Sequence, residues 1–363
     1  MSPKTGVHIF RRGSLALELV RASLVLLAIV GTTALLLFVS GYAVGSGLAA
    51  LWRGSLGSWY AFTSATLVRA VPLMLTGVAV AIAFRAGVLN IGAEGQLLAG
   101  AAAATVVALS LGDNLWAGVV VLLALIASAV GGAGWASIAA HLRSRFAVLE
   151  VISTIMLNFV ALYGVSYLVR GPLQEPTHVY PQSSTIGDAI HLPRIAGAGR
   201  LHGGLLLALG VSVVAGWVLR RTAAGFRLIA AGESPSAATS AGGIDVIATT
   251  TRAFLVSGAL AGIAGGVEVL GVTFALYENI SPGYGYTAIA VALLARLDPW
   301  RVAATALLFG GLEAGAGAMQ RDAGVPSTLV TVIEAALILA VVAGGALRRR
   351  SPVPDAATSP TVA

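Results

Sequence analysis

An uncharged stretch near the amino terminus restricts what this chain can fold into. Residues 22–52 contain no Asp, Glu, Lys or Arg, and about 20 apolar residues are enough for a helix to cross the roughly 30 Å hydrocarbon core of a membrane. A secretory signal has an apolar core of only about 7 to 15 residues. We therefore predict an uncleaved membrane anchor here, with a first span near residues 22–46.

The composition of the whole chain indicates an integral membrane protein. Of its 363 residues, 57% are hydrophobic and 10% are charged, whereas soluble domains carry about 25% charged residues. So little charge argues against a cytosolic enzyme, a nucleic-acid-binding protein and a disordered scaffold. The net charge of +7 does not indicate a nucleic-acid partner, because the basic residues are scattered between apolar runs and form no patch.

Two residue types that are scarce limit the chemistry of the chain. It contains no Cys, which excludes disulfides and thiolate metal sites. Its one lysine is Lys4, so it has no G-x-x-x-x-G-K phosphate-binding loop. We expect no cofactor and no metal in this chain, and if ATP is used, another subunit binds it.

The fold class that we predict is all-α, a polytopic transmembrane helical bundle of about ten spans. Placing the amino terminus in the cytoplasm puts 16 basic residues inside and six outside, which favours an even count with both termini inside. The segment RLDPWR, residues 296–301, separates the eighth span from the ninth and leaves a count of eight open. The expected spans are 22–46, 64–84, 92–111, 116–140, 149–169, 203–219, 251–272, 284–296, 301–319 and 326–347.

The regions outside the spans complete the domain organisation. We expect a cytoplasmic segment at 1–21, a transmembrane domain at 22–347 and a disordered cytoplasmic tail at 348–363. The outer connection, 170–202, contains four prolines, and it is either an ordered loop that meets a partner or a plain loop. The inner connection, 220–250, predicts a short helix that Ser234 caps, Pro235 opens, and Gly242 or Gly243 ends.

Five polar side chains inside the predicted spans are candidates for a solute pathway. Asn90, Glu94 and Gln96 lie among glycines at the start of a span, and Asn158 and Glu268 lie in two later spans. An unsatisfied polar group that faces lipid costs several kcal/mol, so these groups must face protein or water. We favour the pathway because carboxyl groups inside membranes are usually functional. The alternative is that Glu94 only pins two helices together through hydrogen bonds.

Glycines recur at intervals of four in two of the predicted spans. They are Gly258, Gly262 and Gly266 in one span and Gly311 and Gly315 in another. Small residues on one helical face permit close helix crossings. We interpret them as tight packing within one chain in preference to an interface between subunits.

Three strings of residues resemble permease subunits of ATP-binding-cassette (ABC) importers. The segment GFRLIAAGESPSAATSAGGI resembles the cytoplasmic coupling loop of the branch that includes branched-chain amino acid, ribose and nucleoside permeases. RAGVLNIGAEGQLLAGA (85–101) and LEVISTIMLNFVALYGVSYLVRGPL (149–173) look like permeases for nucleosides and simple sugars. The resemblance covers roughly residues 65–345.

This resemblance implies a transport subunit of the bacterial plasma membrane, and not an enzyme. Such a subunit would form an alternating-access pathway for the uptake of nucleosides or related sugar-containing solutes. Its implied partners are ABC ATPase subunits that bind ATP and Mg²⁺, a second identical or homologous permease, an extracytoplasmic solute-binding lipoprotein and the lipid bilayer. The resemblance also implies residues that couple to the ATPase, namely Arg227, Gly232, Glu233, Ser234, Pro235, Ala238 and Gly242.

Two other functional classes must account for the same residues. An intramembrane hydrolase needs a nucleophile with a base, or a metal, but all five His fall in predicted loops or at span ends, and the chain has no H-E-x-x-H string. An ion-coupled secondary transporter of a small polar solute remains the alternative, because Glu94 and Glu268 could bind a proton or a cation.

Overall fold

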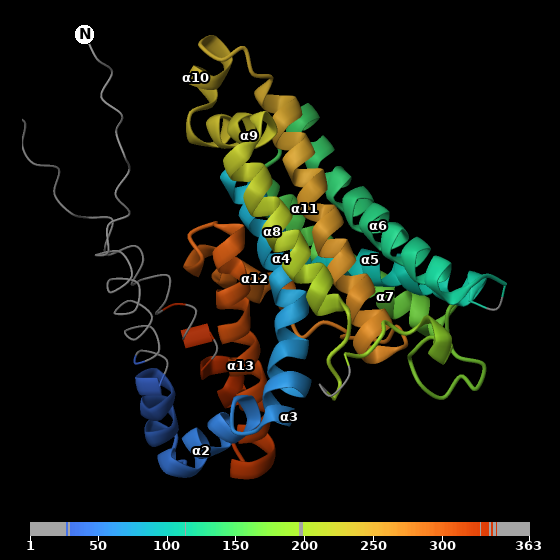
Figure 1. Ribbon diagram of the computed structural model, residues 1–363, viewed down its shortest axis with the longest axis vertical. Coiled ribbons are helices and arrows are strands. Elements are labelled where there is room, and N and C mark those ends of the chain that lie inside the picture. Colours follow the sequence, from blue (N-terminus) through green and yellow to red (C-terminus); the bar gives the residue numbers. More distant parts are fainter. Residues whose placement is uncertain are drawn as a thin grey trace, which may run out of the picture. The chain divides into compact units, whose positions relative to one another are not determined.

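The computed structural model describes residues 27, 30–112, 114–195, 199–326, 328–333, 335, 336 and 339. Over these residues the chain is helical and forms only isolated β-bridges in its loops, which confirms the all-α prediction (Figure 1). The elements are α2 (Val44–Ser55), α3 (Trp59–Ala61), η1 (Phe62–Leu67), α4 (Val68–Arg85), α5 (Ala93–Leu111), α6 (Ala117–Phe146), α7 (Glu150–Arg170), η2 (Asp188–Ile190), α8 (Gly204–Arg221), α9 (Ala223–Glu233), α10 (Pro235–Ser240), α11 (Val246–Glu268), η3 (Val269–Thr273), α12 (Tyr284–Leu294) and α13 (Pro299–Ala323).

The chain divides into two compact units. One unit is Ala50–Ala318, and the other combines Met1–Ala49 with Met319–Ala363. In the second unit, a helix over Val30–Val39 is followed by a turn in which Gly41 has a φ of +79°. All the predicted site residues belong to Ala50–Ala318, and this unit is the one described below.

Seven helices of the described residues are long and apolar enough to cross a membrane. They are Trp59–Arg85, Ala93–Leu111, Ala117–Phe146, Glu150–Arg170, Gly204–Arg221, Val246–Thr273 and Pro299–Ala323, and each coincides with a predicted span to within a few residues. The predicted span 284–296 is different, because α12 has 11 residues and at 1.5 Å per residue reaches only about 16 Å. It does not cross the membrane as a single helix.

The predictions for the two ends of the chain fall mostly outside the described residues. The predicted first span, 22–46, is interrupted, because the helix ends at Val39 and α2 begins at Val44. The segment 1–21, the tail 348–363 and most of the span 326–347 lie outside the described residues. The orientation with both termini inside stays a prediction.

Glycines bring α5, α6 and α11 into close contact at the centre of the unit. A Cβ atom added to Gly100 would lie 2.3 Å from the carbonyl oxygen of Gly262, and one added to Gly132 would lie 2.2 Å from that of Gly258. Gly315 packs in the same way on Leu51, at 2.7 Å from its carbonyl oxygen. The repeated glycines therefore serve helix packing within the chain, as predicted.

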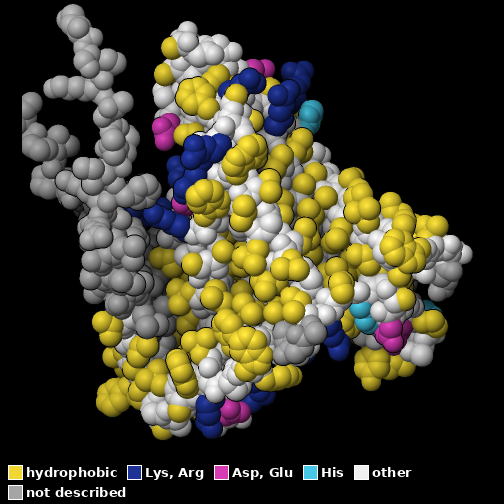
Figure 2. All heavy atoms as spheres, viewed as in Figure 1, with side chains coloured by type: hydrophobic (Ala, Val, Ile, Leu, Met, Phe, Trp, Pro, Cys, Tyr) yellow, Lys and Arg dark blue, Asp and Glu magenta, His cyan; other side chains and the backbone are white. Residues whose placement is uncertain are grey.

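Burial distinguishes central helices from peripheral ones. In the most apolar window of each span, 83% of the residues of Trp59–Arg85 are buried, compared with 22% in Ala117–Phe146. The exposed side chains of α6 include Leu122, Ile126 and Val130, which suit contact with lipid. Figure 2 shows hydrophobic side chains over the middle of one face, with many of the visible basic side chains toward the end that carries α9 and α10.

Candidate functional site

A break between α4 and α5 positions most of the predicted polar residues. Helix α4 ends at Arg85, whose guanidinium donates to the carbonyl oxygens of Leu297 (3.2 Å) and Arg296 (3.1 Å). Gly87 then takes a φ of +74°, a left-handed conformation that glycine adopts without strain. The chain consequently turns, and α5 begins at Ala93.

Asn90 and Gln96 close this break with a reciprocal pair of amide hydrogen bonds. Nδ2 of Asn90 donates to Oε1 of Gln96, and Nε2 of Gln96 donates to Oδ1 of Asn90, both over 2.9 Å. Nδ2 of Asn90 also donates to the hydroxyl of Ser257 in α11 (2.8 Å), which in turn donates to the carbonyl oxygen of Ala79 in α4 (2.7 Å). The pair therefore joins the break to two central helices.

Asn158 attaches α7 to the same break. Its Oδ1 accepts from the backbone N–H of Gly95 (2.8 Å), and its Nδ2 donates to the carbonyl oxygen of Ile91 (3.0 Å) and to the hydroxyl of Tyr286 in α12 (3.1 Å). The side chain is 2% exposed. An Asn thus satisfies backbone groups that the irregular segment leaves without helical partners.

Glu94 joins the first turns of α5 and α12. Its Oε2 accepts from the backbone N–H of Gly285 (2.7 Å), and Ser281 supplies a further hydrogen bond from its side chain. A Cβ atom on Gly285 would lie 2.2 Å from the backbone N of Glu94, so only glycine permits this approach. Four of the five predicted polar residues, Asn90, Glu94, Gln96 and Asn158, are therefore buried around one break, which we call the polar hub.

Glu268 is buried apart from the hydrogen bonds of the polar hub. It is the last residue of α11, it is 5% exposed, and its carboxylate accepts no hydrogen bond from a described residue. Burial without a hydrogen-bond partner among the described residues separates the Glu268 carboxylate from the other candidates.

Three further residues that form hydrogen bonds with the polar hub were not predicted from the sequence. Ser257, Gly285 and Tyr286 come from α11 and α12. A single Ser in an apolar helix gives no signal of its own, since hydroxyls commonly bond their own helix backbone. The string SPGYGY, residues 281–286, does offer a signal where it leads into the first turn of α12, because Gly and Pro mark irregular backbone.

The inner connection contains two helices where one was predicted. The hydroxyl of Thr222 caps α9 by accepting from the N–H of Gly225 (3.2 Å), and Asp245 caps α11 by accepting from the N–H of Ala248 (2.9 Å). Pro235 opens α10 as predicted, and Gly243, with a φ of +58°, follows its end. α9 and α10 lie together at one end of the unit (Figure 1).

The predicted cap by the side chain of Ser234 is wrong. Ser234 precedes α10, but its hydroxyl makes no capping hydrogen bond. The reason is that α9 continues to Glu233, so that the N–H of Ser234 donates to Ala230 (3.1 Å) and its carbonyl accepts from Ala238 (2.9 Å). The backbone of this residue thus links the two helices directly.

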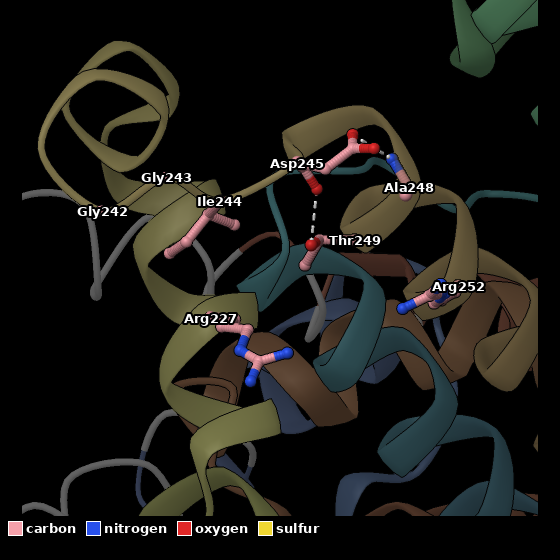
Figure 3. Close-up of a pocket in the computed structure, with 8 residues that line it drawn as sticks. All are labelled: Arg227, Gly242, Gly243, Ile244, Asp245, Ala248, Thr249 and Arg252. Carbon is pink, nitrogen blue, oxygen red and sulfur yellow. Dashed lines mark hydrogen bonds between the residues drawn. The ribbon is translucent and has the colours of Figure 1, made fainter.

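The seven predicted coupling residues take three kinds of position. Gly232 contacts the end of α4, where an added Cβ would lie 2.2 Å from the carbonyl oxygen of Arg85, and Ala238 is buried in α10. Arg227 and Gly242 line an open cavity of about 360 Å³ together with the first turns of α11 (Figure 3). Glu233, Ser234 and Pro235 are exposed, as are Arg227 and Gly242.

The described residues of the outer connection form hydrogen bonds with η3 and with the loop that follows it. Ser183 donates its N–H to Leu276 (2.7 Å), and Leu192 donates to Leu270 (2.8 Å). The guanidinium of Arg170 forms two hydrogen bonds with Glu278, at 2.6 and 2.9 Å. These bonds, with a third from Ser166, lower the pKa of Glu278 to about 2.

Comparison with known proteins identifies the family. A model for the branched-chain amino acid transport system permease component matches residues 62–342. The chain belongs to this permease family. It is 38% identical over 319 residues to the guanosine ABC transporter permease protein NupP of Bacillus subtilis (strain 168), a match that covers 87% of this chain and 90% of NupP.

Two further relatives cover most of their own length. The chain is 39% identical to the glucose ABC transporter permease protein TsgB13 of Haloferax volcanii over 78% of this chain and 76% of that protein. It is 31% identical to the nucleoside ABC transporter permease protein NupB of Lactococcus lactis subsp. cremoris over 84% of this chain and 85% of NupB. No solved structure gives a match.

Membership in this family confirms the resemblance found in the sequence. The chain is the permease component of a transport system, and not an enzyme. The seven long apolar helices found among the described residues agree with a multi-pass protein of the plasma membrane. The polar hub is accordingly a feature inside a transport domain.

Proposed function

We propose that this chain is a permease subunit of an ABC importer for nucleosides or related sugars. The supporting observation is the match to NupP over 87% of this chain and 90% of that protein, together with the nucleoside and glucose permeases above. The solutes in these names share a ring that carries several hydroxyl groups. The ion-coupled alternative gains no support from any relative reported above.

The five polar residues belong to the transport pathway in this proposal, in two different ways. Asn90, Glu94, Gln96 and Asn158 hold the break between α4 and α5 in place, since each is hydrogen-bonded to protein. Irregular backbone at membrane depth is tolerated where protein buries it or where it lines a cavity. Glu268, whose carboxylate lacks such bonds, is the member that contacts solute.

The coupling segment transmits ATPase movement to the polar hub in this proposal. α9 and α10 contact the ATPase subunit, which binds ATP and Mg²⁺. Gly232 of α9 lies against Arg85 and Gly87, and Asn90 follows Gly87 by only three residues. A displacement of α9 is therefore passed directly to the break between α4 and α5, through the contact of Gly232 with Gly87. A second permease subunit completes the pathway, and a solute-binding lipoprotein meets the outer connection, 170–202.

Uptake by the complete transporter tests this proposal. Cells that lack their own uptake of nucleosides and glucose would express this permease with its partner subunits and receive the radiolabelled solutes one at a time. We expect accumulation of at least one of them, loss of accumulation when the ATPase subunit cannot hydrolyse ATP, and persistence when a protonophore is added with ATP maintained. Loss with the protonophore alone would contradict the proposal and favour ion coupling.

A further inference from the structure

The turn between α12 and α13 contains two strained residues in succession. Arg296 and Leu297 both have a φ of +56°, in the left-handed region that residues with a Cβ atom disfavour. The N–H of Leu297 donates to the carbonyl oxygen of Ala292 (2.8 Å), and the N–H of Arg296 donates to that of Leu293 (3.0 Å). These bonds end α12 in a motif whose first left-handed position usually holds glycine. Here arginine and leucine take the left-handed positions, so the surrounding structure must hold them there.

The side chain of Arg85, the last residue of α4, binds this turn. Its Nε donates to the carbonyl oxygen of Leu297 (3.2 Å) and its Nη2 donates to that of Arg296 (3.1 Å). One planar guanidinium thus bonds the carbonyls of both strained residues, as its fixed set of donors allows. Backbone oxygens just beyond the end of a helix lack helical partners. The charged donor therefore satisfies these oxygens and holds the two residues in the left-handed conformation.

The start of α13, directly after this turn, is attached to α8. Asp298 forms ion pairs with Arg220 of α8 and with Arg301 of α13. The indole Nε1 of Trp300 donates to the carbonyl oxygen of Val213 in α8 (3.2 Å), and the guanidinium of Arg220 lies 4.2 Å from the centre of the Trp300 ring. The strained turn is therefore held between α4, through a side chain, and α8, through the start of α13.

Arg85 also connects α9 to the polar hub. Its backbone carbonyl contacts Gly232 of α9 so closely that an added Cβ would overlap it. At the other end of α12, the N–H of Gly285 donates to the carboxylate of the hub (2.7 Å), and the hydroxyl of Tyr286 accepts from an amide of the hub (3.1 Å). α12 has 11 residues and is about 16 Å long. A displacement of its last turn is therefore delivered to the hub by one short helix.

We propose that Arg85 is a positioning residue for transport, whose guanidinium ties α9 to α12 by holding the strained turn between α12 and α13. This inference rests on the proposed function, in which α9 contacts the ATPase subunit. The contact between Gly232 and Gly87 leads to the α5 side of the hub, and the Arg85 side chain leads to its α12 side. A movement of α9 thus reaches both sides of the hub together.

Hydrogen–deuterium exchange of the purified transporter complex tests whether Arg85 holds the turn. Arg85→Met keeps an apolar stem but removes every donor. It should speed exchange of the amides of Arg296 and Leu297 by about tenfold, the factor expected for one lost hydrogen bond from a charged group. Glycine adopts a positive φ without strain, so Leu297→Gly added to Arg85→Met should restore part of the protection. Equal exchange in Arg85→Met and wild type would refute the proposal.

Arg145→Met is the matched control, because it removes an exposed arginine from the last turn of α6. Exchange in the turn should be unchanged in this variant. Arg85→Lys keeps a charge but has a single ammonium in place of the planar fork, and its exchange should lie between those of wild type and Arg85→Met. It replaces Arg85→Met in the comparison if that variant does not assemble.

The amount of solute taken up per ATP hydrolysed, measured in proteoliposomes with the complete transporter, tests the link to transport. Arg85→Met should lower this ratio by about tenfold while ATP hydrolysis without solute continues, and Leu297→Gly should recover part of it in the double variant. A merely structural role would reduce the amount of assembled complex and leave the ratio unchanged, which would refute the proposal. Wild type that takes up neither nucleosides nor glucose would overturn the proposed function instead, and the exchange measurement would still decide whether Arg85 holds the turn.

Discussion

Gly232→Ala tests whether the contact between α9 and the end of α4 carries the coupling. A Cβ at this position would lie 2.2 Å from the carbonyl oxygen of Arg85 and 2.8 Å from the carbonyl carbon of Ala86. Both are backbone atoms, so neither can rotate away. Restoring an ordinary contact of 3.4 Å requires the two segments to separate by about 1 Å, a shift of the size that an overpacked site forces on backbone.

Two opposing contributions determine how Gly232→Ala changes the free energy of unfolding. Replacing Gly by Ala inside a helix stabilises it by about 0.5–1 kcal/mol, whereas overpacking typically costs about 1–3 kcal/mol. The net result for Gly232→Ala is a loss of unfolding free energy of roughly 0–2.5 kcal/mol. Gly210→Ala in α8 is the matched control, because nothing lies within 4 Å of its added Cβ and only the favourable term applies.

The assay is uptake together with solute-stimulated ATP hydrolysis in proteoliposomes that contain the complete transporter. Gly232→Ala should lower both activities together, while Gly210→Ala should match wild type. Equal amounts of each variant in the membrane, checked by immunoblot, exclude a simple loss of protein. If Gly232→Ala behaves like Gly210→Ala in both measurements, the contact does not transmit movement and the reasoning fails.

Three other predictions concern topology, the outer connection and the polar hub. A reporter fused after residue 350 should score cytoplasmic and one inserted near Thr185 should score outside; the same side for both would contradict the orientation. The pKa of Glu278 is lowered to about 2, first by the hydrogen bond from Arg170, so this contact is complete above about pH 4.5 and is lost as the pH falls toward 2. Limited proteolysis with pepsin should therefore cut the segment after Arg170 faster as the pH falls through this range, and a Glu278→Gln variant whose cleavage accelerated equally would contradict the assignment. Glu94→Gln keeps an acceptor for the backbone N–H at the start of α12 and should retain more uptake than Glu94→Leu, which keeps none; equal uptake in the two variants would show that this hydrogen bond is not needed.

The positions of most long helices could be predicted from sequence for a simple physical reason. Charged residues are scarce in the hydrocarbon core, so the limits of a run without charge mark the approximate limits of a span. The predicted spans 92–111 and 149–169 correspond to Ala93–Leu111 and Glu150–Arg170. The same reasoning overestimated α12, because the uncharged residues 284–295 are too few for a helix that crosses the roughly 30 Å hydrocarbon core.

The inner connection contains features that local sequence patterns predict and others that they do not. The positions of Pro235 and Gly243 at the two ends of α10 could be predicted, because each residue favours a backbone conformation that few other residues share. The helix α9 could not, because its apolar residues resemble a continuation of α8 and only Thr222 separates the two. The Ser234 side chain does not cap α10, because α9 extends to the residue before it. Whether a residue caps a helix depends on whether the backbone before it is already helical.

Glu94 and Glu268 show why a candidate site needs hydrogen-bond partners as well as burial. In sequence both are single carboxyl groups among glycines and apolar residues, and in the structure both are less than 10% exposed. They differ in what surrounds them: Glu94 receives a backbone N–H from Gly285, which lies 191 residues away in the chain, whereas Glu268 receives none from a described residue. A partner that is distant in sequence leaves no local signature. The positions of the two residues inside predicted spans could therefore identify both as candidates, but could not tell which carboxyl group the protein supplies with a hydrogen-bond donor. In the proposed function, the carboxyl group that folding leaves without a donor is the one that contacts solute.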